Sequence, residues 1–98
     1  MLFGIIVTPK ADTTEKDEKR VLQLFANWNQ PSGYEIKSHY LGSDGGTIII
    51  AEASSAEAVS EASAPWHAYF DMKVTPVVEI AKSVEISQKA FAWRDSVK

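Results

Sequence analysis

The sequence of 98 residues contains no cysteine. This absence excludes disulfide bonds, cysteine-ligated metal or iron–sulfur centres, and a cysteine nucleophile. Long apolar runs are missing as well. The apolar opening Leu2–Val7 is too short for a signal-peptide core, and nothing approaches the roughly 20 apolar residues of a membrane-spanning helix. We therefore expect a soluble, cytoplasmic protein with no membrane partner.

Basic charge is scarce. The chain has 10 Lys and Arg residues against 13 Asp and Glu residues, which gives a formal net charge of −3 at pH 7. A general attraction to phosphate backbones therefore has no electrostatic source. Proteins that bind RNA on a β-sheet need aromatic side chains in a basic setting, whereas Lys37 is the only basic residue between positions 35 and 71. We expect no nucleic-acid partner.

The overall composition is that of a globular domain. Hydrophobic residues make up 45% of the chain and charged residues 23%, which is an ordinary mixture for a folded protein. A chain of this length holds one core. We expect a single domain over residues 1–98, in which residues 1–78 form the core and residues 79–98 form a C-terminal helical extension.

The spacing of apolar residues predicts four strands and three helices. In the first helix, Val21, Leu22, Leu24, Phe25 and Trp28 recur at the spacing of one helical face. The expected strands are Leu2–Thr8, Tyr34–Leu41, Thr47–Ala53 and Tyr69–Val78, and the expected helices run from about Thr13 to Asn29, Ser55 to Ala64 and Glu79 to Val97.

Helix starts, turns and edges carry local signals. Asp12 precedes Glu15 by three residues and Ser54 precedes Glu57 by three, so each pair predicts a capping box at a helix N-terminus. The glycine-rich segment 42–46 predicts a hairpin turn. Pro76 predicts that the last strand reaches an edge position, because proline cannot donate to a sheet ladder.

The order of these elements predicts an α+β fold of the ferredoxin-like β-α-β-β-α-β type. Its four-stranded antiparallel sheet carries both crossover helices on one face, and the C-terminal helix follows. The first strand is expected to be buried on both faces. In the third strand, Ile48 and Ile50 face one way and Ile49 the other. A contiguous apolar face is not left in water, so either the C-terminal helix or a second copy of the chain should cover it.

The C-terminal helix carries apolar residues on two sides. Ile80, Val84 and Phe91 share one stripe, and Ile86, Ala90, Trp93 and Val97 form another about 120° or more away. One stripe can pack on the parent domain, and the second needs another surface. We expect a homodimer formed through the open sheet face, with Trp93 and Val97 in the interface or covering the sheet.

The last strand carries a recognisable pattern. Trp66, Asp71, Pro76 and Val77 follow the spacing Trp-x4-Asp-x4-Pro-Val. With this pattern, its element order and its size, the stretch 1–78 resembles the dimeric α+β barrel superfamily, within a small, functionally uncharacterised branch. The resemblance implies two ferredoxin-like chains that appose their sheets as a dimeric α/β barrel. The superfamily includes small monooxygenases, isomerases, haem-degrading enzymes and ligand-binding proteins, so the resemblance implies no single function.

Two histidines are the candidate proton-transfer groups. His39 lies mid-strand, and His67 precedes the last strand with Asp71 four residues later. A His–Asp pair can orient an imidazole as a general base. In the alternative interpretation, one histidine is solvated and the other makes a structural hydrogen bond. No nucleophile or oxyanion motif accompanies them.

Metal and haem sites have little support in the sequence. A metal ion would need three ligands from among His39, His67, Asp44, Asp71 and Glu52, and these include no close-spaced pair such as His-x-x-x-His. Haem binding through a lone histidine rests on fold analogy alone. We expect no metal and no cofactor.

Aromatic residues supply the remaining candidate site. In this fold they can line a pocket between sheet and helices, and the alanine-rich second helix leaves space for one. The candidate ligand-binding residues are Tyr34, His39, Tyr40, Trp66, His67, Tyr69 and Lys73.

The expected ligand is small and largely apolar, a lipid-like or aromatic acid such as a fatty acid. A nucleotide would need a phosphate cradle, and the chain has no glycine loop at a helix start and no basic cluster. Sugars need many converging polar side chains, which the aliphatic first and third strands do not offer. Two alternatives stay open. One is a cofactor-independent enzyme, such as a small monooxygenase or isomerase, acting on such a ligand. The other is a structural or interaction dimer with a filled core.

Overall fold

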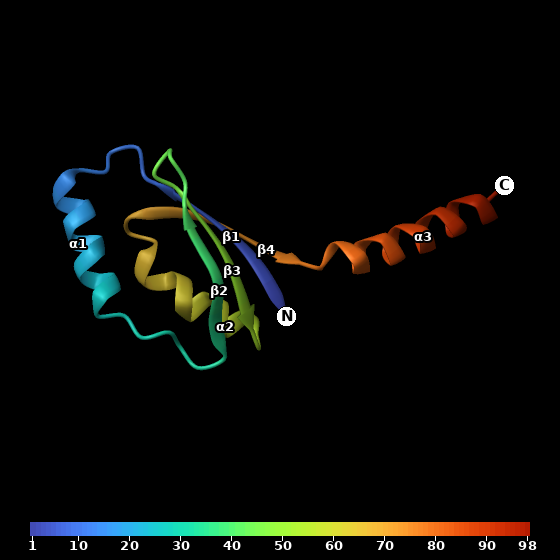
Figure 1. Ribbon diagram of the computed structural model, residues 1–98, viewed down its shortest axis with the longest axis horizontal. Coiled ribbons are helices and arrows are strands. Elements are labelled where there is room, and N and C mark those ends of the chain that lie inside the picture. Colours follow the sequence, from blue (N-terminus) through green and yellow to red (C-terminus); the bar gives the residue numbers. More distant parts are fainter.

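The α+β fold is seen in a computed structural model that describes all residues, Met1–Lys98. The elements are β1 (Leu2–Pro9), α1 (Glu15–Ala26), β2 (Tyr34–Leu41), β3 (Thr47–Ala53), α2 (Ala56–Ser63), the 3₁₀ turn η1 (Ala64–Trp66), β4 (Phe70–Val77) and α3 (Ile80–Ser96). The strands form one antiparallel sheet in the order β2-β3-β1-β4 (Figure 1). The predicted β-α-β-β-α-β order is confirmed, and the sheet is open rather than closed into a barrel.

The position of each strand follows from its sequence. The apolar strand β1 lies in the centre, where Ile5 is paired with Ile49 of β3 on one side and Val74 of β4 on the other. β4 is an edge strand, as Pro76 predicts. The expectation that β1 is buried on both faces is wrong for the single chain. Ile5 is 0% exposed, but its neighbour Ile6 points to the opposite face and is 51% exposed.

The capping box predicted at α1 is displaced along the sequence, and the one predicted at α2 does not form. At α1, Thr14 is the N-cap instead of Asp12: its Oγ1 accepts from the Asp17 amide at 3.2 Å, and its own amide donates to Asp17 Oδ2 at 3.0 Å. At α2, Ser55 Oγ accepts from the Ala58 amide at 3.1 Å, so Ser55 caps the helix and Ser54 does not. Neighbouring hydroxyls at each start can cap equally well, and local geometry decides between them.

The turn between β2 and β3 forms as predicted. The Gly42 amide donates to the Gly46 carbonyl at 2.7 Å, and Asp44 Oδ1 accepts from the Gly46 amide at 2.9 Å. Gly45 takes a positive φ of 86°, a conformation that residues with a side chain rarely adopt.

The core lies on one face of the sheet, called here the helix face. It is formed by Phe3, Ile5, Val7, Tyr34, Ile49, Ala51, Ala53, Ala58, Val59 and Ala62. α2 supplies Ala58, Val59 and Ala62, and these small side chains let it lie close to the strands. Figure 1 shows α1 and α2 on the same side of the sheet.

The opposite face of the sheet, called here the open face, has no helix on it. From the strand register, its residues are Leu2, Gly4, Ile6, Thr8, Glu35, Ser38, Tyr40, Ile48, Ile50, Glu52, Asp71, Lys73, Thr75 and Val77. Ile48 is 55% exposed and Tyr40 69% exposed. The side chains of Val77 and Ile50 cover Gly4 on this face. A Cβ added at Gly4 would lie 3.3 Å from Val77 Cγ1 and 4.0 Å from Ile50 Cδ1. The central part of the open face is therefore an apolar surface in contact with solvent, and Glu35, Glu52 and Asp71 lie toward its margins.

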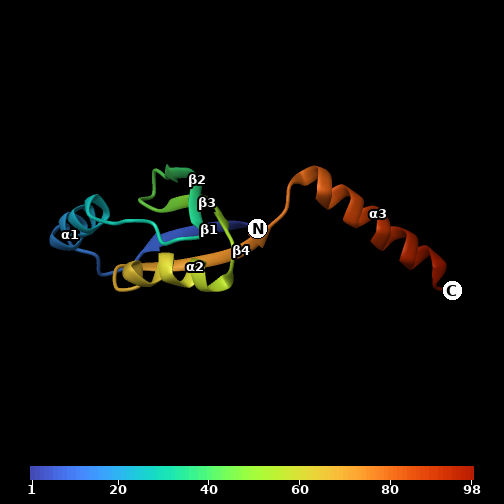
Figure 2. The same cartoon turned by 90° about the horizontal axis from the view of Figure 1, so that it is seen from below.

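α3 extends away from the rest of the chain, and none of its residues is buried (Figures 1 and 2). The Cα radius of gyration is 17.5 Å, whereas a compact chain of this length has about 13 Å. The extended backbone of Glu79, with φ −63° and ψ 148°, separates α3 from β4. The alternative in which α3 covers the sheet of its own chain is therefore wrong. No helix combines the length and apolarity needed to cross a bilayer.

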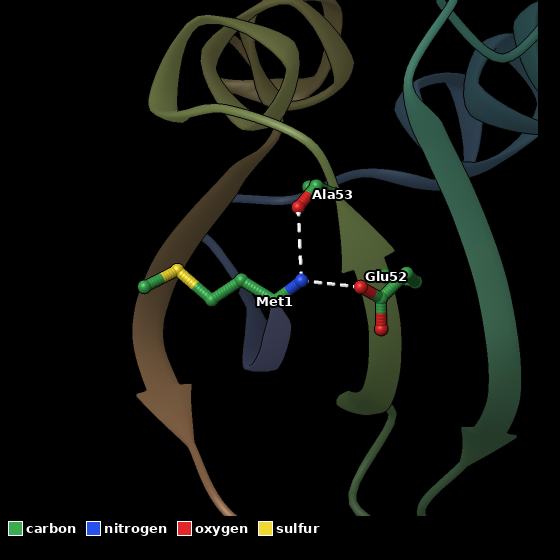
Figure 3. A network of polar contacts seen from close by, with 3 residues as sticks. All are labelled: Met1, Glu52 and Ala53. Carbon is green, nitrogen blue, oxygen red and sulfur yellow. Dashed lines mark hydrogen bonds and ion pairs between the residues drawn. The ribbon is translucent and has the colours of Figure 1, made fainter.

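The start of the chain is fixed at the end of β3. The Met1 ammonium contacts the Glu52 carboxylate and donates to the Ala53 carbonyl at 3.3 Å (Figure 3). Leu2 is paired with Val77, the last residue of β4. The N-terminus, the end of β3 and the departure point of α3 thus share one end of the sheet.

Replacing Ser63 by alanine is expected to stabilise the fold by about 1 kcal/mol, because a buried hydroxyl without a partner carries its desolvation penalty uncompensated. Ser63 Oγ is buried at the end of α2 and has no hydrogen-bond partner. Urea unfolding followed by circular dichroism measures the change. Ser60→Ala, an exposed serine of the same helix, is the control and should show no gain. A loss of stability in Ser63→Ala would contradict the prediction.

Candidate functional site

An apolar cavity of about 150 Å³ lies between α1, the end of α2 with η1, and the helix face of the sheet. Its lining residues are Val7, Val21, Leu22, Phe25, Trp28, Tyr34, Ile36, His39, Thr47, Ile49, Ala62, Trp66, Phe70 and Met72. All four strands contribute a residue, so the cavity sits over the middle of the sheet rather than at one edge.

The cavity exists because α1 stands off the sheet. No residue of α1 is buried. Large aromatic rings hold it at this distance. Trp28 meets Trp66 edge to face with ring centroids 5.5 Å apart, and Phe25 lies 6.1 Å from Trp66. Rings in edge-to-face or tilted arrangements at these separations attract one another, and they leave the apolar stripe of α1 facing an unfilled space.

A β-bulge brings His39 to the cavity. The pairing of β2 with β3 shifts between Ile36 and Ser38, so that Ile36 is opposite Ala51 and His39 is opposite Ile49. In a regular strand, residues three apart point to opposite faces. The extra residue places Ile36 and His39 on the same face, as bulges commonly re-aim side chains. The His39 ring lies 5.9 Å from Phe25, edge to face.

The polar content of the cavity is small. His39 is exposed, and with Thr47 it contributes the two lining residues that are not hydrophobic. Tyr34 is buried, and this burial raises the pKa of its phenol above the ordinary value for tyrosine. The cavity therefore has the exposed His39 imidazole and the buried Tyr34 phenol as its polar groups within a mainly apolar lining. Such a lining suits a molecule with an apolar body and a polar end.

Three residues of the set predicted to bind a ligand meet in this cavity: Tyr34, His39 and Trp66. Tyr40 and Lys73 lie elsewhere. Tyr40 is paired with Ile48 and Lys73 with Ile6, so both belong to the open face. The sheet itself separates them from the cavity.

The other two predicted residues lie outside the cavity. His67 is exposed at the end of η1. Tyr69 lines a separate pocket beside the start of α1, with Asp17 and Glu18. Asp71 binds Lys10 Nζ at 3.1 Å and forms no hydrogen bond with His67, so the hypothetical His–Asp pair is not present.

Several lining residues were not among the predicted site residues. Val21 and Phe25 belong to the apolar stripe that predicts α1. Thr47 and Met72 carried no signal beyond their strands. The apolar stripe of α1 is the signal that could have identified Val21 and Phe25 as cavity-lining residues. The stripe alone does not suffice, because the cavity exists only where the bulky Trp28 and Trp66 keep α1 away from the sheet.

The chemistry available to the cavity is binding of an apolar group with a polar end. No three His, Asp or Glu side chains gather in an arrangement that could hold a metal ion. No hydrogen bond from a protein group orients the His39 imidazole, whereas a general base is normally positioned by such a bond.

Comparisons with known proteins identify a family but no individual relative. No curated protein and no solved structure matches the chain significantly. A family model described as a domain of unknown function, DUF3303, matches residues 1–91. This match spans the sheet, both crossover helices and most of α3. The chain belongs to the DUF3303 family.

Proposed function

We propose that the protein binds a small, largely apolar carboxylic acid in the cavity beneath α1. The observation that carries this proposal is the lining: 12 of the 14 residues around the cavity are hydrophobic, and His39 is one of the two others. The apolar body of the ligand lies among Trp28, Trp66 and Ile49. Its carboxylate lies at His39, where a protonated imidazole can donate a charge-assisted hydrogen bond.

The size of the cavity narrows the class of ligand. A dry apolar cavity of about 150 Å³ accommodates one benzene-sized molecule. An aromatic acid or the first few methylenes of a fatty acid therefore fit as the cavity stands. A two-ring aromatic acid or a longer chain requires α1 to move outward, and α1 can do so at low cost because none of its residues is buried. Each methylene that enters contributes about 0.8 kcal/mol before association costs.

The proposal is for binding rather than catalysis. A cofactor-independent enzyme would need a second group to orient or complement His39. The residues around His39 are Phe25, Thr47 and aliphatic side chains, which supply no such group. The cavity offers shape and apolar contact, which serve a binding protein.

The second part of the proposal is a homodimer formed through the open face. Its support is the exposure of Ile6, Tyr40 and Ile48 on adjacent strands, an apolar surface that a monomer rarely leaves in water. Two such sheets packed face to face give the arrangement that the resemblance to dimeric α+β barrels implies. Because the cavity lies on the helix face, dimerisation leaves it accessible.

Filling the cavity is expected to abolish binding. Val21 lines the cavity from α1 and is not buried, so Val21→Phe occupies the space without disturbing the core. We expect it to weaken binding of 2-naphthoate or decanoate at least 10-fold, measured by isothermal titration calorimetry. Gln23→Phe, on the outer side of the same helix, is the matched control and should bind like the unmodified protein.

A thermal-shift panel tests the class of ligand. Decanoate and 2-naphthoate should raise the melting temperature, and AMP and glucose should leave it unchanged. Stabilisation by AMP or glucose alone would contradict the proposal. So would equal binding of the acids to the unmodified protein and to Val21→Phe.

A further inference from the structure

A second pocket adjoins the cavity beneath α1. It lies beside the start of α1 and next to the turn between β2 and β3 (Figure 1), and its volume is about 480 Å³. Val21, Leu22 and Phe70 line both this adjoining pocket and the cavity. These three side chains are therefore the wall between the two spaces.

The wall is built so that it can open. Val21 and Leu22 both belong to α1, which contributes no buried residue to the fold. A ligand larger than the cavity moves α1 outward, and this movement carries the two side chains away from Phe70 together because they are neighbours on one helix. The cavity then continues into the adjoining pocket.

Exposed apolar side chains line the adjoining pocket. Leu22 is 70% exposed and Leu41 75% exposed. A hydrocarbon chain that lies against them removes apolar surface from water, which favours binding in proportion to the area buried. Leu41 follows His39 by two residues on β2, and two residues of a strand span about 7 Å. A chain whose carboxylate lies at His39 can therefore reach this pocket.

The adjoining pocket is acidic. Asp17, Glu18 and Asp44 line it, and no lysine or arginine does. None of these three carboxylates forms an ion pair. The positive end of the α1 dipole is equivalent to about half a charge and offsets only part of their negative charge. An uncharged group can enter the pocket, whereas an anion there meets like charges.

From these features we infer that the protein selects long-chain monocarboxylic acids over α,ω-dicarboxylic acids, because the adjoining pocket receives the far end of the chain. The inference rests on the proposed function, which places the first carboxylate at His39. A benzene-sized group fills the cavity. The remaining methylenes of a ten-carbon acid therefore pass Val21 and Leu22 and enter the adjoining pocket.

The three carboxylates of the adjoining pocket determine this selectivity. A methyl end lies against Leu22 and Leu41 without an electrostatic cost. A second carboxylate at the same place is repelled by Asp17, Glu18 and Asp44, since like charges a few ångströms apart repel even where water screens them.

Methyl NMR tests where the far end of the chain lies. Leu41 lines the adjoining pocket but not the cavity, and Ile49 lines the cavity but not the adjoining pocket. The protein is labelled with ¹³C at its Ile and Leu methyl groups, and the two signals are assigned with Leu41→Val and Ile49→Val. We expect decanoate to shift both signals. Benzoate, whose ring fits the cavity, should shift the Ile49 signal alone.

Isothermal titration calorimetry tests the selectivity. Decanedioate should bind at least 10-fold more weakly than decanoate, and Glu18→Lys should reduce this ratio at least fivefold. Glu18 suits the substitution because Asp17 caps α1 and Asp44 holds the β2–β3 turn through its own hydrogen bond. Glu15→Lys is the matched control. It makes the same charge change in the first turn of α1 but on the outer side, and it should leave the ratio unchanged.

The outcomes separate this inference from the proposal on which it rests. If neither benzoate nor decanoate shifts the Ile49 signal, the binding site beneath α1 is overturned and the selectivity with it. If both acids shift Ile49 but decanoate leaves Leu41 unmoved, the inference is overturned and the binding site stands. Equal affinities for decanoate and decanedioate, or equal effects of Glu15→Lys and Glu18→Lys on their ratio, also overturn the inference alone.

Discussion

Replacing Ile5 by alanine is expected to remove most of the free energy that stabilises the fold. Ile5 is 0% exposed at the centre of β1, with Ile49 and Val74 beside it in the sheet. Removing a buried isoleucine side chain to alanine typically costs 2–5 kcal/mol, on the order of the loss expected here. Small domains have total stabilities near the lower end of roughly 5–15 kcal/mol. Most of the folding free energy would therefore be lost.

Urea unfolding followed by circular dichroism at 25 °C measures this loss. Ile6→Ala is the matched control, because the same residue type stands one position further along but points to the open face. At a protein concentration low enough to exclude dimers, Ile6→Ala should lower the free energy of unfolding by less than about 1 kcal/mol. Equal losses at the two positions would contradict the division of the sheet into a packed face and an open one.

Introducing a charge at Ile48 is expected to abolish the proposed dimerisation through the open face. Ile48 is 55% exposed in the middle of the open face, between Tyr40 and Ile6. In a two-fold interface, Ile48→Lys places two like charges close together and removes both from water. We expect the dimer dissociation constant to rise at least 100-fold in sedimentation equilibrium, while the circular dichroism spectrum of the folded chain is retained.

Leu41→Lys is the control for that change. Leu41 is also highly exposed on the same hairpin, but its pairing with Thr47 places it on the helix face. It should leave the dissociation constant unchanged. The open face is not the interface if Leu41→Lys weakens the dimer as much as Ile48→Lys does.

The sequence predicts the fold well because its signals are local. The bounds of β2 and β3 agree with the expected Tyr34–Leu41 and Thr47–Ala53, since strong turn residues precede and follow each strand. The remaining elements begin and end within a few residues of expectation. The starts of α1 and α2 show the limit of such signals. Thr14 and Ser55 are as well suited to cap a helix as their neighbours, and only the backbone geometry selects them.

The candidate site depends on features that periodicity does not encode. A bulge near residue 37 puts His39 on the helix face, whereas Tyr40 and Lys73 are carried to the other side of the sheet. The distance between α1 and the sheet depends on how the large rings of Trp28 and Trp66 meet. The direction of α3 depends on the backbone at Glu79. None of these can be inferred from the spacing of apolar residues alone.

The positions of the three tryptophans allow the most direct test of ligand binding in the cavity. Trp28 and Trp66 line it, and Trp93 lies on exposed α3. Titration of ¹⁵N-labelled protein with 2-naphthoate, followed through the three indole N–H signals assigned by Trp→Phe variants, is therefore internally controlled. Saturable shifts of the Trp28 and Trp66 signals with an unmoved Trp93 signal are the predicted result. A titration in which only Trp93 shifts, or in which none of the three shifts, would contradict a binding site beneath α1.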